Sequence, residues 1–151
     1  SPLHIAAENG NINIIKLLLE HRVDVLAKDG NGFTAMDIAE QSGHKLVMQL
    51  LKDAVDDLER TRHELYESLC ICCSKGNAME TKDILEKCGT DAEVIVNKTP
   101  SGCNTLLFKA CQDGYTNIVE LLISAGADGR IHPVTKYSPL YIACYLGRKE
   151  I

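Results

Sequence analysis

The sequence predicts an all-α solenoid of about 4.6 stacked helix-turn-helix units. A short stretch that begins with Ser or Thr recurs at a fixed period: Ser1 and Thr34 are 33 residues apart, and so are Thr105 and Ser138. Each copy is followed at the same offset by a glycine, namely Gly10, Gly43, Gly114 and Gly147. After three of these glycines comes an apolar stripe with helical spacing, at residues 14–19, 47–51 and 118–123.

The first helix of each unit is predicted from its two ends. Ser or Thr is a favourable N-cap, and Pro2 and Pro139 lie in the first turn, where a missing N–H costs nothing. The glycine ends the helix in a left-handed conformation. The Leu-rich second helix then packs into a core shared with neighbouring units, because one unit cannot bury its apolar face alone.

These residues resemble the ankyrin repeat, whose signature contains Thr-Pro-Leu-His and a later Gly-Ala-Asp. The first motif appears as Ser1-Pro2-Leu3-His4 and the second as Gly126-Ala127-Asp128. The resemblance implies a single ankyrin-repeat solenoid over residues 1–151, with short hairpin loops and one irregular central repeat. The expected repeats are approximately 1–30, 31–63, 64–101, 102–134 and an incomplete 135–151.

The third repeat departs from the pattern. Its first helix is predicted around residues 67–73, before Gly76, and its second over 79–87, ended by Cys88 and Gly89. The distance from Glu67 to Thr105 is five residues longer than one period. We place one extra residue between Gly76 and Gly89, and the other four in a loop around residues 91–100.

Residues 53–69 carry six acidic and two basic side chains, which is net −4 of the −5 of the whole chain. Leu51, Ala54, Leu58, Thr61 and Leu65 have helical spacing, and no glycine or proline occurs between Lys45 and Lys75. We expect the second helix of the second repeat to run on here and to replace the hairpin. The alternative is an irregular loop.

Composition excludes several classes. With 45% hydrophobic residues the chain is too apolar to be disordered. No apolar run reaches the ~18–20 residues of a membrane span, so we expect no membrane insertion. With 16 basic and 21 acidic residues, a nucleic-acid partner is not expected.

No cofactor, metal or catalytic site is predicted. Cys73, Cys111 and Cys144 share the small, buried slot of Ala7, Cys72 has the slot of Ala6, and buried free cysteine behaves as a small hydrophobe. The cysteine spacing does not match a zinc site, and the loop 28–32 lacks the flanking carboxylates of a calcium loop. Asn31-Gly32 instead favours a tight two-residue hairpin turn. In the family, His4 and His44 occupy structural slots.

The resemblance implies a non-catalytic module of a larger protein that binds a protein partner through its concave face. Aromatic residues are candidate anchors there; the alternative is that Phe33 and Tyr137 pack against their own hairpins. Slot by slot, the predicted protein-binding residues are Glu8, Asn9, Lys28, Asn31, Phe33, Gln41, Ser42, Gln112, Asp113, His132, Tyr137 and Tyr145.

Two further expectations concern the whole protein. Neither end shows a polar capping repeat, so we expect flanking ankyrin repeats of the same chain. The odd number of cysteines suits a reducing compartment, so we expect a cytoplasmic location, with the nucleus as the alternative. An alternative function is an accessory, intramolecular regulatory domain of a large signalling enzyme, such as a leucine-rich-repeat kinase with a GTPase-like domain.

Overall fold

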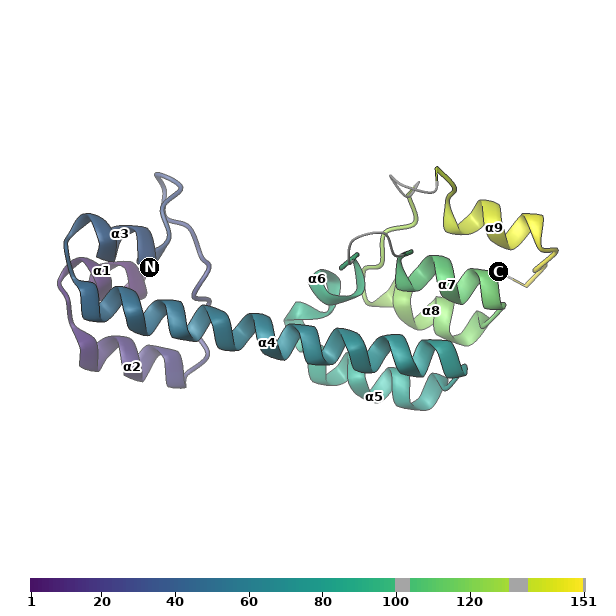
Figure 1. Cartoon of the computed structure of the whole chain (residues 1–151), viewed down its shortest axis with the longest axis horizontal. Helices are drawn as coiled ribbons and strands as arrows, with labels where there is room; N and C mark the ends of the chain where they lie inside the picture. The colour runs from purple at the N-terminus through teal and green to yellow at the C-terminus, as the bar shows by residue number, and fades with distance from the viewer. Residues whose placement is uncertain (100–103, 131–135, 151) are drawn as a thin grey trace. The chain divides into compact units, whose positions relative to one another are not determined.

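The computed structural model describes residues 1–99, 104–130 and 136–150. The chain divides into two compact units, Ser1–Arg60 (unit 1) and Thr61–Ile151 (unit 2). The described part is helical apart from turns and one isolated antiparallel bridge between Lys28 and Thr34, which confirms the all-α class. Figure 1 shows the order of the helices along the chain.

Unit 1 consists of α1 (Pro2–Glu8), α2 (Ile12–Glu20), α3 (Ala35–Gln41) and the first part of α4 (Lys45–Lys75). The first helices α1 and α3 pack against each other, and α1 also packs against α2. Their small residues allow this close approach. The core that results is formed by Leu3, Ala6, Ala7, Ile15, Ala35, Ala39, Val47 and Leu51.

Two histidines join the two repeats of unit 1. The Nε2–H of the buried His4 ring donates to the Phe33 carbonyl at 3.0 Å, and its Nδ1 accepts from the Ser1 hydroxyl at 2.6 Å. The His44 ring lies over Gly10 and hydrogen-bonds to the Glu8 carbonyl at 2.9 Å. Both structural roles are therefore confirmed. Ser1 begins α1, but its hydroxyl is used by His4 rather than by the backbone of the helix.

The hairpin between the repeats of unit 1 differs from the predicted two-residue turn. The Gly32 N–H donates to the Asp29 carbonyl, and the Asp29 N–H donates to the Phe33 carbonyl, so Gly30, Asn31 and Gly32 form a three-residue loop. Gly32 has a φ of +87°, which a side chain would strain. The Asp29 carboxylate accepts from the backbone N–H groups of Phe33 and Asn31, which holds its pKa below the usual value. This carboxylate is what favours the longer loop.

Helix α4 runs without interruption from Lys45 to Lys75. The predicted helix at 53–69 is thus confirmed, and the alternative loop is wrong. The helix also includes the first helix of the third repeat, so one element replaces a helix, a hairpin and a second helix. The division between the two units and the expected repeat boundary at 63/64 both fall inside α4.

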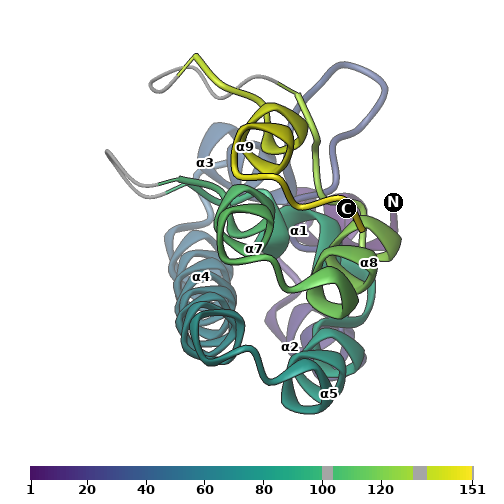
Figure 2. The same cartoon turned by 90° about the vertical axis from the view of Figure 1, so that its right-hand side faces the viewer.

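Unit 2 continues with α5 (Ala78–Cys88), the 3₁₀ turn η1 (Gly89–Asp91), α6 (Ala92–Val96), α7 (Leu106–Asp113), α8 (Thr116–Ser124) and α9 (Pro139–Tyr145). Viewed end-on, α9, α7 and the C-terminal part of α4 form one layer, and α8 and α5 form a second layer beside it (Figure 2). Contacts of α7 with α8 and α9, and of α5 with α8, hold the layers together. Leu69, Ile95, Ile118 and Leu122 are fully buried between them.

The insertion of the third repeat is helical, so the predicted loop around residues 91–100 is wrong for residues 91–96. Ile95 and Val96 are buried in the core of unit 2, and this burial favours a short helix over a loop. The Arg62 guanidinium pairs with the Asp91 carboxylate at 2.8 Å. The Asn97 amide donates to the Gly126 carbonyl and accepts from the Asp128 N–H, which joins the insertion to the next repeat.

The first helices begin and end as the repeat pattern predicts. Thr34, Thr105 and Ser138 each cap their helix through a hydrogen bond from the backbone three residues later. The terminal glycines have positive φ at residues 10, 43, 76, 114 and 147.

One cysteine does not follow its predicted burial. Cys73 and Cys111 are buried, but Cys144, in the same slot, is exposed. Helix α9 packs against α7 and covers Cys111, whereas no described element covers the corresponding face of α9, where Cys144 lies.

Candidate functional site

The predicted binding residues lie at the surface. Every one of them that the structure describes is exposed, and His132 lies outside the described residues. Unit 1 holds Glu8, Asn9, Lys28, Asn31, Phe33, Gln41 and Ser42, and unit 2 holds Gln112, Asp113, Tyr137 and Tyr145. The candidates therefore form two separate sets, one on each unit.

The candidates of unit 1 are mostly polar. The Asn9 side chain donates to the Ile5 carbonyl of its own helix. Lys28 and Phe33 flank the hairpin loop, and the backbone of Phe33 is already bonded to Asp29 and His4. The Phe33 ring is 41% exposed, so it is the one large apolar candidate of this unit.

In unit 2 the exposed residues of the first helices recur in register. Positions are counted here from the start of each repeat's first helix, which is Glu67 within α4, Thr105 before α7 and Ser138 before α9. The fourth, seventh and eighth positions after this start are exposed on both α4 and α7, whereas the fifth and sixth are buried. On α9 the last two of these slots are exposed and the first is half-buried. We call this the first-helix face of unit 2, formed by Ile71, Ser74 and Lys75 on α4, Lys109, Gln112 and Asp113 on α7, and Tyr145 and Leu146 at the end of α9.

An aromatic stack borders this face. The rings of Tyr137 and Tyr141 are 4.8 Å apart between centroids and 8° from parallel, and those of Tyr141 and Tyr145 are 6.2 Å apart and 12° from parallel. Their exposed fractions are 49%, 49% and 74%. Stacking of this kind fixes exposed rings that would otherwise rotate freely. We call these three residues the tyrosine ladder.

Sequence reasoning missed Tyr141 and Ile71. The four-residue spacing of Tyr137, Tyr141 and Tyr145 was the available signal, because residues i and i+4 lie on one side of a helix. Ile71, 54% exposed, occupies the slot of Lys109 one repeat earlier. The same slot holds Ile5, Ile38 and Ile142 in the other repeats and a polar residue in Lys109 alone, so nothing in the sequence set Ile71 apart.

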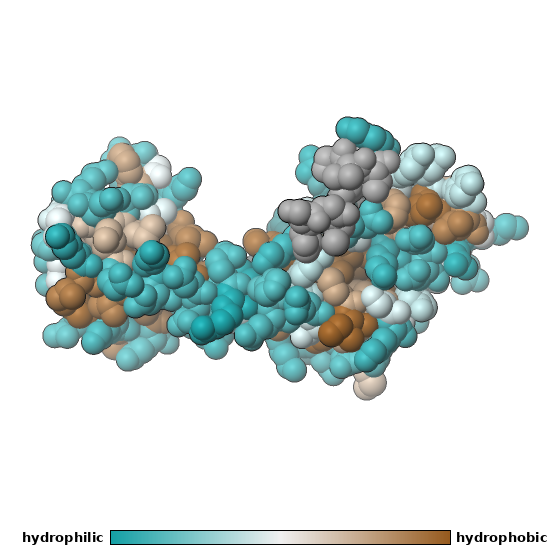
Figure 3. Space-filling model, viewed as in Figure 1, coloured by the Kyte–Doolittle hydropathy of each residue, from teal (hydrophilic) through white to brown (hydrophobic). Residues whose placement is uncertain are grey.

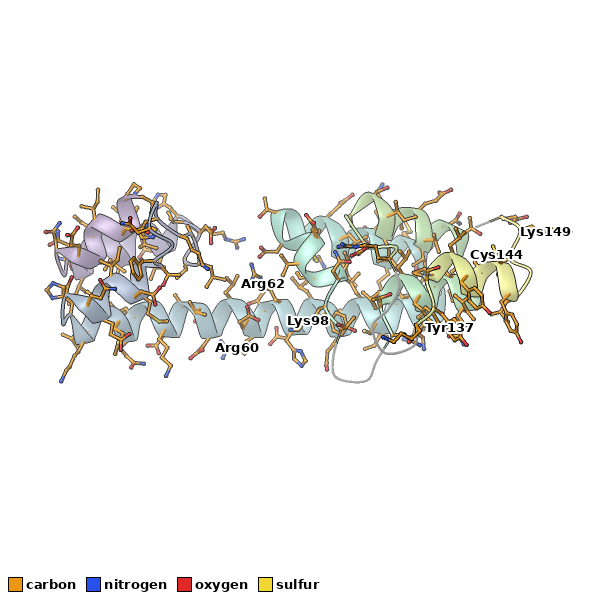
Figure 4. The ribbon with its side chains drawn as sticks, turned by 90° about the horizontal axis from the view of Figure 1, so that it is seen from above. Arg60, Arg62, Lys98, Tyr137, Cys144 and Lys149 are labelled. Atoms are coloured by element: carbon orange, nitrogen blue, oxygen red, sulfur yellow. The ribbon has the colours of Figure 1, made fainter. Side chains whose placement is uncertain are left out.

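The hydropathy of the surface agrees with this set. Figure 3 shows exposed apolar residues over α9, and a second apolar patch over the C-terminal part of α4. Figure 4 shows Tyr137 beside α9 and Lys149 beyond the end of that helix. The two apolar patches of Figure 3 therefore lie over α9 and α4, two of the first helices of unit 2.

Four cysteines of unit 2 are buried thiols with raised pKa values. Burial raises the pKa of Cys73 and of Cys111 to about 11, and burial also raises the pKa of Cys72 and of Cys88. At neutral pH these groups are protonated thiols, and the thiolate is the reactive form. They therefore act as small apolar core residues.

The described residues hold neither a cluster of metal-ligating side chains nor a helix that could cross a membrane. No group of three or more His, Cys, Asp or Glu residues within them is placed to hold a metal ion. None of their helices combines the length and the hydropathy that a membrane crossing requires.

Comparison with known proteins gives matches along the whole chain. The family model described as ankyrin repeats (3 copies) matches residues 1–61 and again 69–151. The gap between the two matches lies inside α4, where the helix replaces a hairpin.

The relatives are much longer proteins. Rabankyrin-5 of Homo sapiens is 33% identical over 155 aligned residues, covering all of this chain and 13% of the relative. Ankyrin repeat and KH domain-containing protein mask-1 of Caenorhabditis elegans is 30% identical over 151 residues, covering 99% of this chain and 6% of the relative. The chain thus corresponds to a small part of each of these proteins.

Proposed function

Because the chain belongs to the ankyrin repeat family, we propose that it is a protein-binding module that holds its partner on the first-helix face and the tyrosine ladder of unit 2. Ankyrin repeats are generally non-catalytic modules of protein-protein interaction. The observation that carries the proposal is the exposed ladder, since tyrosine provides a large contact area at low cost in side-chain entropy.

The position of Tyr145 supports an anchoring role. Its slot corresponds to Gln112 on α7 and to Ser74 on α4, and both are exposed although α7 is packed against α9. Side chains at this position of the repeat are therefore exposed even where another repeat packs on the helix, so the exposure of Tyr145 does not result from α9 being the last described helix. The Tyr145 ring contacts Tyr141 on one side and leaves the rest of its surface for a partner.

We also propose a cytoplasmic location and flanking repeats of the same chain. The free thiols of the described cysteines support the first. Exposed Leu140, Tyr141 and Cys144, whose counterparts on α7 are buried, support the second. A following repeat would cover Tyr141 and leave Tyr145 exposed for a partner, as Gln112 is exposed on α7. The activity of the whole protein, including a role within a larger signalling enzyme, is a further hypothesis.

The proposal is tested by selecting binders from displayed random peptides of about 12 residues, long enough in extended form to cross three helices. Affinities of the selected peptides are then measured by fluorescence anisotropy. Tyr145→Ala should weaken binding by about tenfold or more, which is ~1.4 kcal/mol, without changing the melting temperature.

Ile123→Ala is the matched control, because Ile123 is an exposed apolar residue on the second helix α8. Its affinities should equal those of the unchanged chain. Selected peptides that all bind Tyr145→Ala as tightly as the unchanged chain would refute the proposed binding face.

A further inference from the structure

Lysines outnumber carboxylates on and beside the first-helix face of unit 2. Lys75 and Lys109 lie in its exposed slots, and exposed Lys136 directly precedes the tyrosine ladder. One carboxylate, Asp113, shares these slots. Exposed Glu67, four residues before Ile71 on α4, adds a second carboxylate at the edge and pairs with His63. Three lysines therefore stand against two carboxylates, in a unit whose acidic and basic residues are nearly equal in number.

These three lysines are free to pair with another molecule, unlike three other cations of the same unit. Within the described residues none of the three has a carboxylate within ion-pair distance, whereas Arg62, Lys82 and Arg130 pair with Asp91, Glu86 and Asp128. An exposed lysine without an internal partner keeps its charge available for another molecule.

The centre of the surface is uncharged. Residues 137–147, which include the whole ladder and α9, contain no acidic or basic side chain. An apolar, aromatic centre with a charged rim is the usual composition of a protein-binding surface. Here the rim is basic, which specifies the charge of the partner.

The direction of the face favours an extended partner. It crosses α4, α7 and α9, and neighbouring packed helices are separated by about 8–10 Å. An extended chain advances by about 3.3 Å per residue, so about six residues cross the three helices. Apolar side chains of such a segment can reach the tyrosines while its carboxylates reach the lysines.

We propose that this face binds an extended acidic peptide segment with bulky apolar side chains, held by Lys75, Lys109 and Lys136 around the tyrosine ladder. The inference rests on the proposed function and adds the chemical class of the partner. A basic segment is disfavoured, because the unpaired lysines would repel it despite the attraction of cations to tyrosine rings.

The experiment uses the peptides selected above for binding that depends on Tyr145. Their average net charge should be clearly negative, and replacing their Glu and Asp by Gln and Asn should weaken binding by about tenfold. Raising the salt concentration from about 0.05 to 0.3 M should weaken binding as well, since the contacts lie at an exposed rim.

Charge reversal on the chain gives the second arm. The double variant Lys109→Glu and Lys136→Glu should weaken acidic peptides by about tenfold. The control Lys16→Glu changes an exposed lysine on the second helix α2 of unit 1 and should leave affinity unchanged. Both variants should keep the melting temperature of the unchanged chain.

The outcomes separate the two claims. Neutral or basic peptides that depend on Tyr145 would overturn the acidic class and leave the protein-binding function standing. A single-stranded oligonucleotide that binds the ladder more tightly than every selected peptide would overturn it too, because stacked aromatics with lysines can also hold bases. A set without any Tyr145-dependent peptide would refute both claims.

Discussion

The first helices α3 and α7 occupy equivalent positions in their repeats but offer opposite surfaces to a following repeat. On α7 the slots of Leu107, Phe108 and Cys111 are buried, and α9 packs there. On α3 the same slots hold Met36, Asp37 and Glu40, and Glu40 is exposed.

The glycines at the ends of these helices show the same contrast. A Cβ at Gly114 would lie within 3 Å of the Arg148 side chain, whereas one at Gly43 would meet no described atom within 4 Å. The 33-residue period therefore predicts where the helices lie. Whether a following repeat can pack against a first helix depends on the residues at these three positions. A further repeat on α3 would have to bury a carboxylate.

The largest loss of stability should come from replacing Cys111 on α7 by glutamate, the residue that α3 has at the equivalent position, Glu40. Cys111→Glu puts a carboxylate into a slot that is 2% exposed, where an unpaired charge costs several kcal/mol. We expect a loss of about 4 kcal/mol or more in the free energy of unfolding, with α9 released, measured by denaturation and hydrogen exchange. A loss under about 1 kcal/mol would show that this slot does not control stacking.

A core substitution in the second layer comes next. Leu122→Ala should cost about 3–5 kcal/mol, because Leu122 is fully buried. Leu121, at the neighbouring position, is half-buried and should cost clearly less as Leu121→Ala. Urea denaturation compares the two. Equal losses of unfolding free energy in the two variants would contradict the burial of Leu122 and the partial exposure of Leu121.

Removing the histidine that joins the repeats of unit 1 should have a moderate effect. His4→Ala removes one of the two hydrogen bonds to the Phe33 carbonyl, which keeps the bond from the Asp29 N–H, and it empties a buried site. It should cost about 1–3 kcal/mol. Hydrogen exchange should increase in α1 and the hairpin but not in unit 2. His21→Ala is the control, since exposed His21 bonds only within its own turn. Unchanged exchange in His4→Ala would contradict the linking role.

The smallest effect is the reciprocal change on α3. Glu40→Ala should alter the free energy of unfolding by less than about 0.5 kcal/mol, because the side chain is exposed and alanine favours helices. Together with Cys111→Glu it tests one slot in two contexts. A destabilisation above about 1 kcal/mol would mean that Glu40 makes a contact of its own.

The sequence predicted much of the fold because capping, glycine and apolar spacing are local signals. They located the first helices, the left-handed glycines and the uninterrupted helix at 53–69. They did not show that residues 91–96 are helical, since the reason is burial of Ile95 and Val96 against distant residues. The exposure of Cys144 was missed likewise, because it depends on what covers α9.

The candidate site was predicted only in part. The position of a residue within the repeat predicted that Tyr137 and Tyr145 lie at the surface. It did not predict that both rings stack on Tyr141, because stacking depends on the orientation of the rings. The assignment of candidates to two units was not predicted either, because the division between the units falls inside the uninterrupted helix α4.

The central claim is that unit 2 binds a partner on its first-helix face. Backbone NMR shifts of the chain, titrated with one selected acidic peptide, test this claim directly. We predict that changes concentrate at residues 71–75, 109–113 and 136–146, with unit 1 and helix α8 unaffected. Changes confined to α2, α8 or the hairpin of unit 1 would contradict the account.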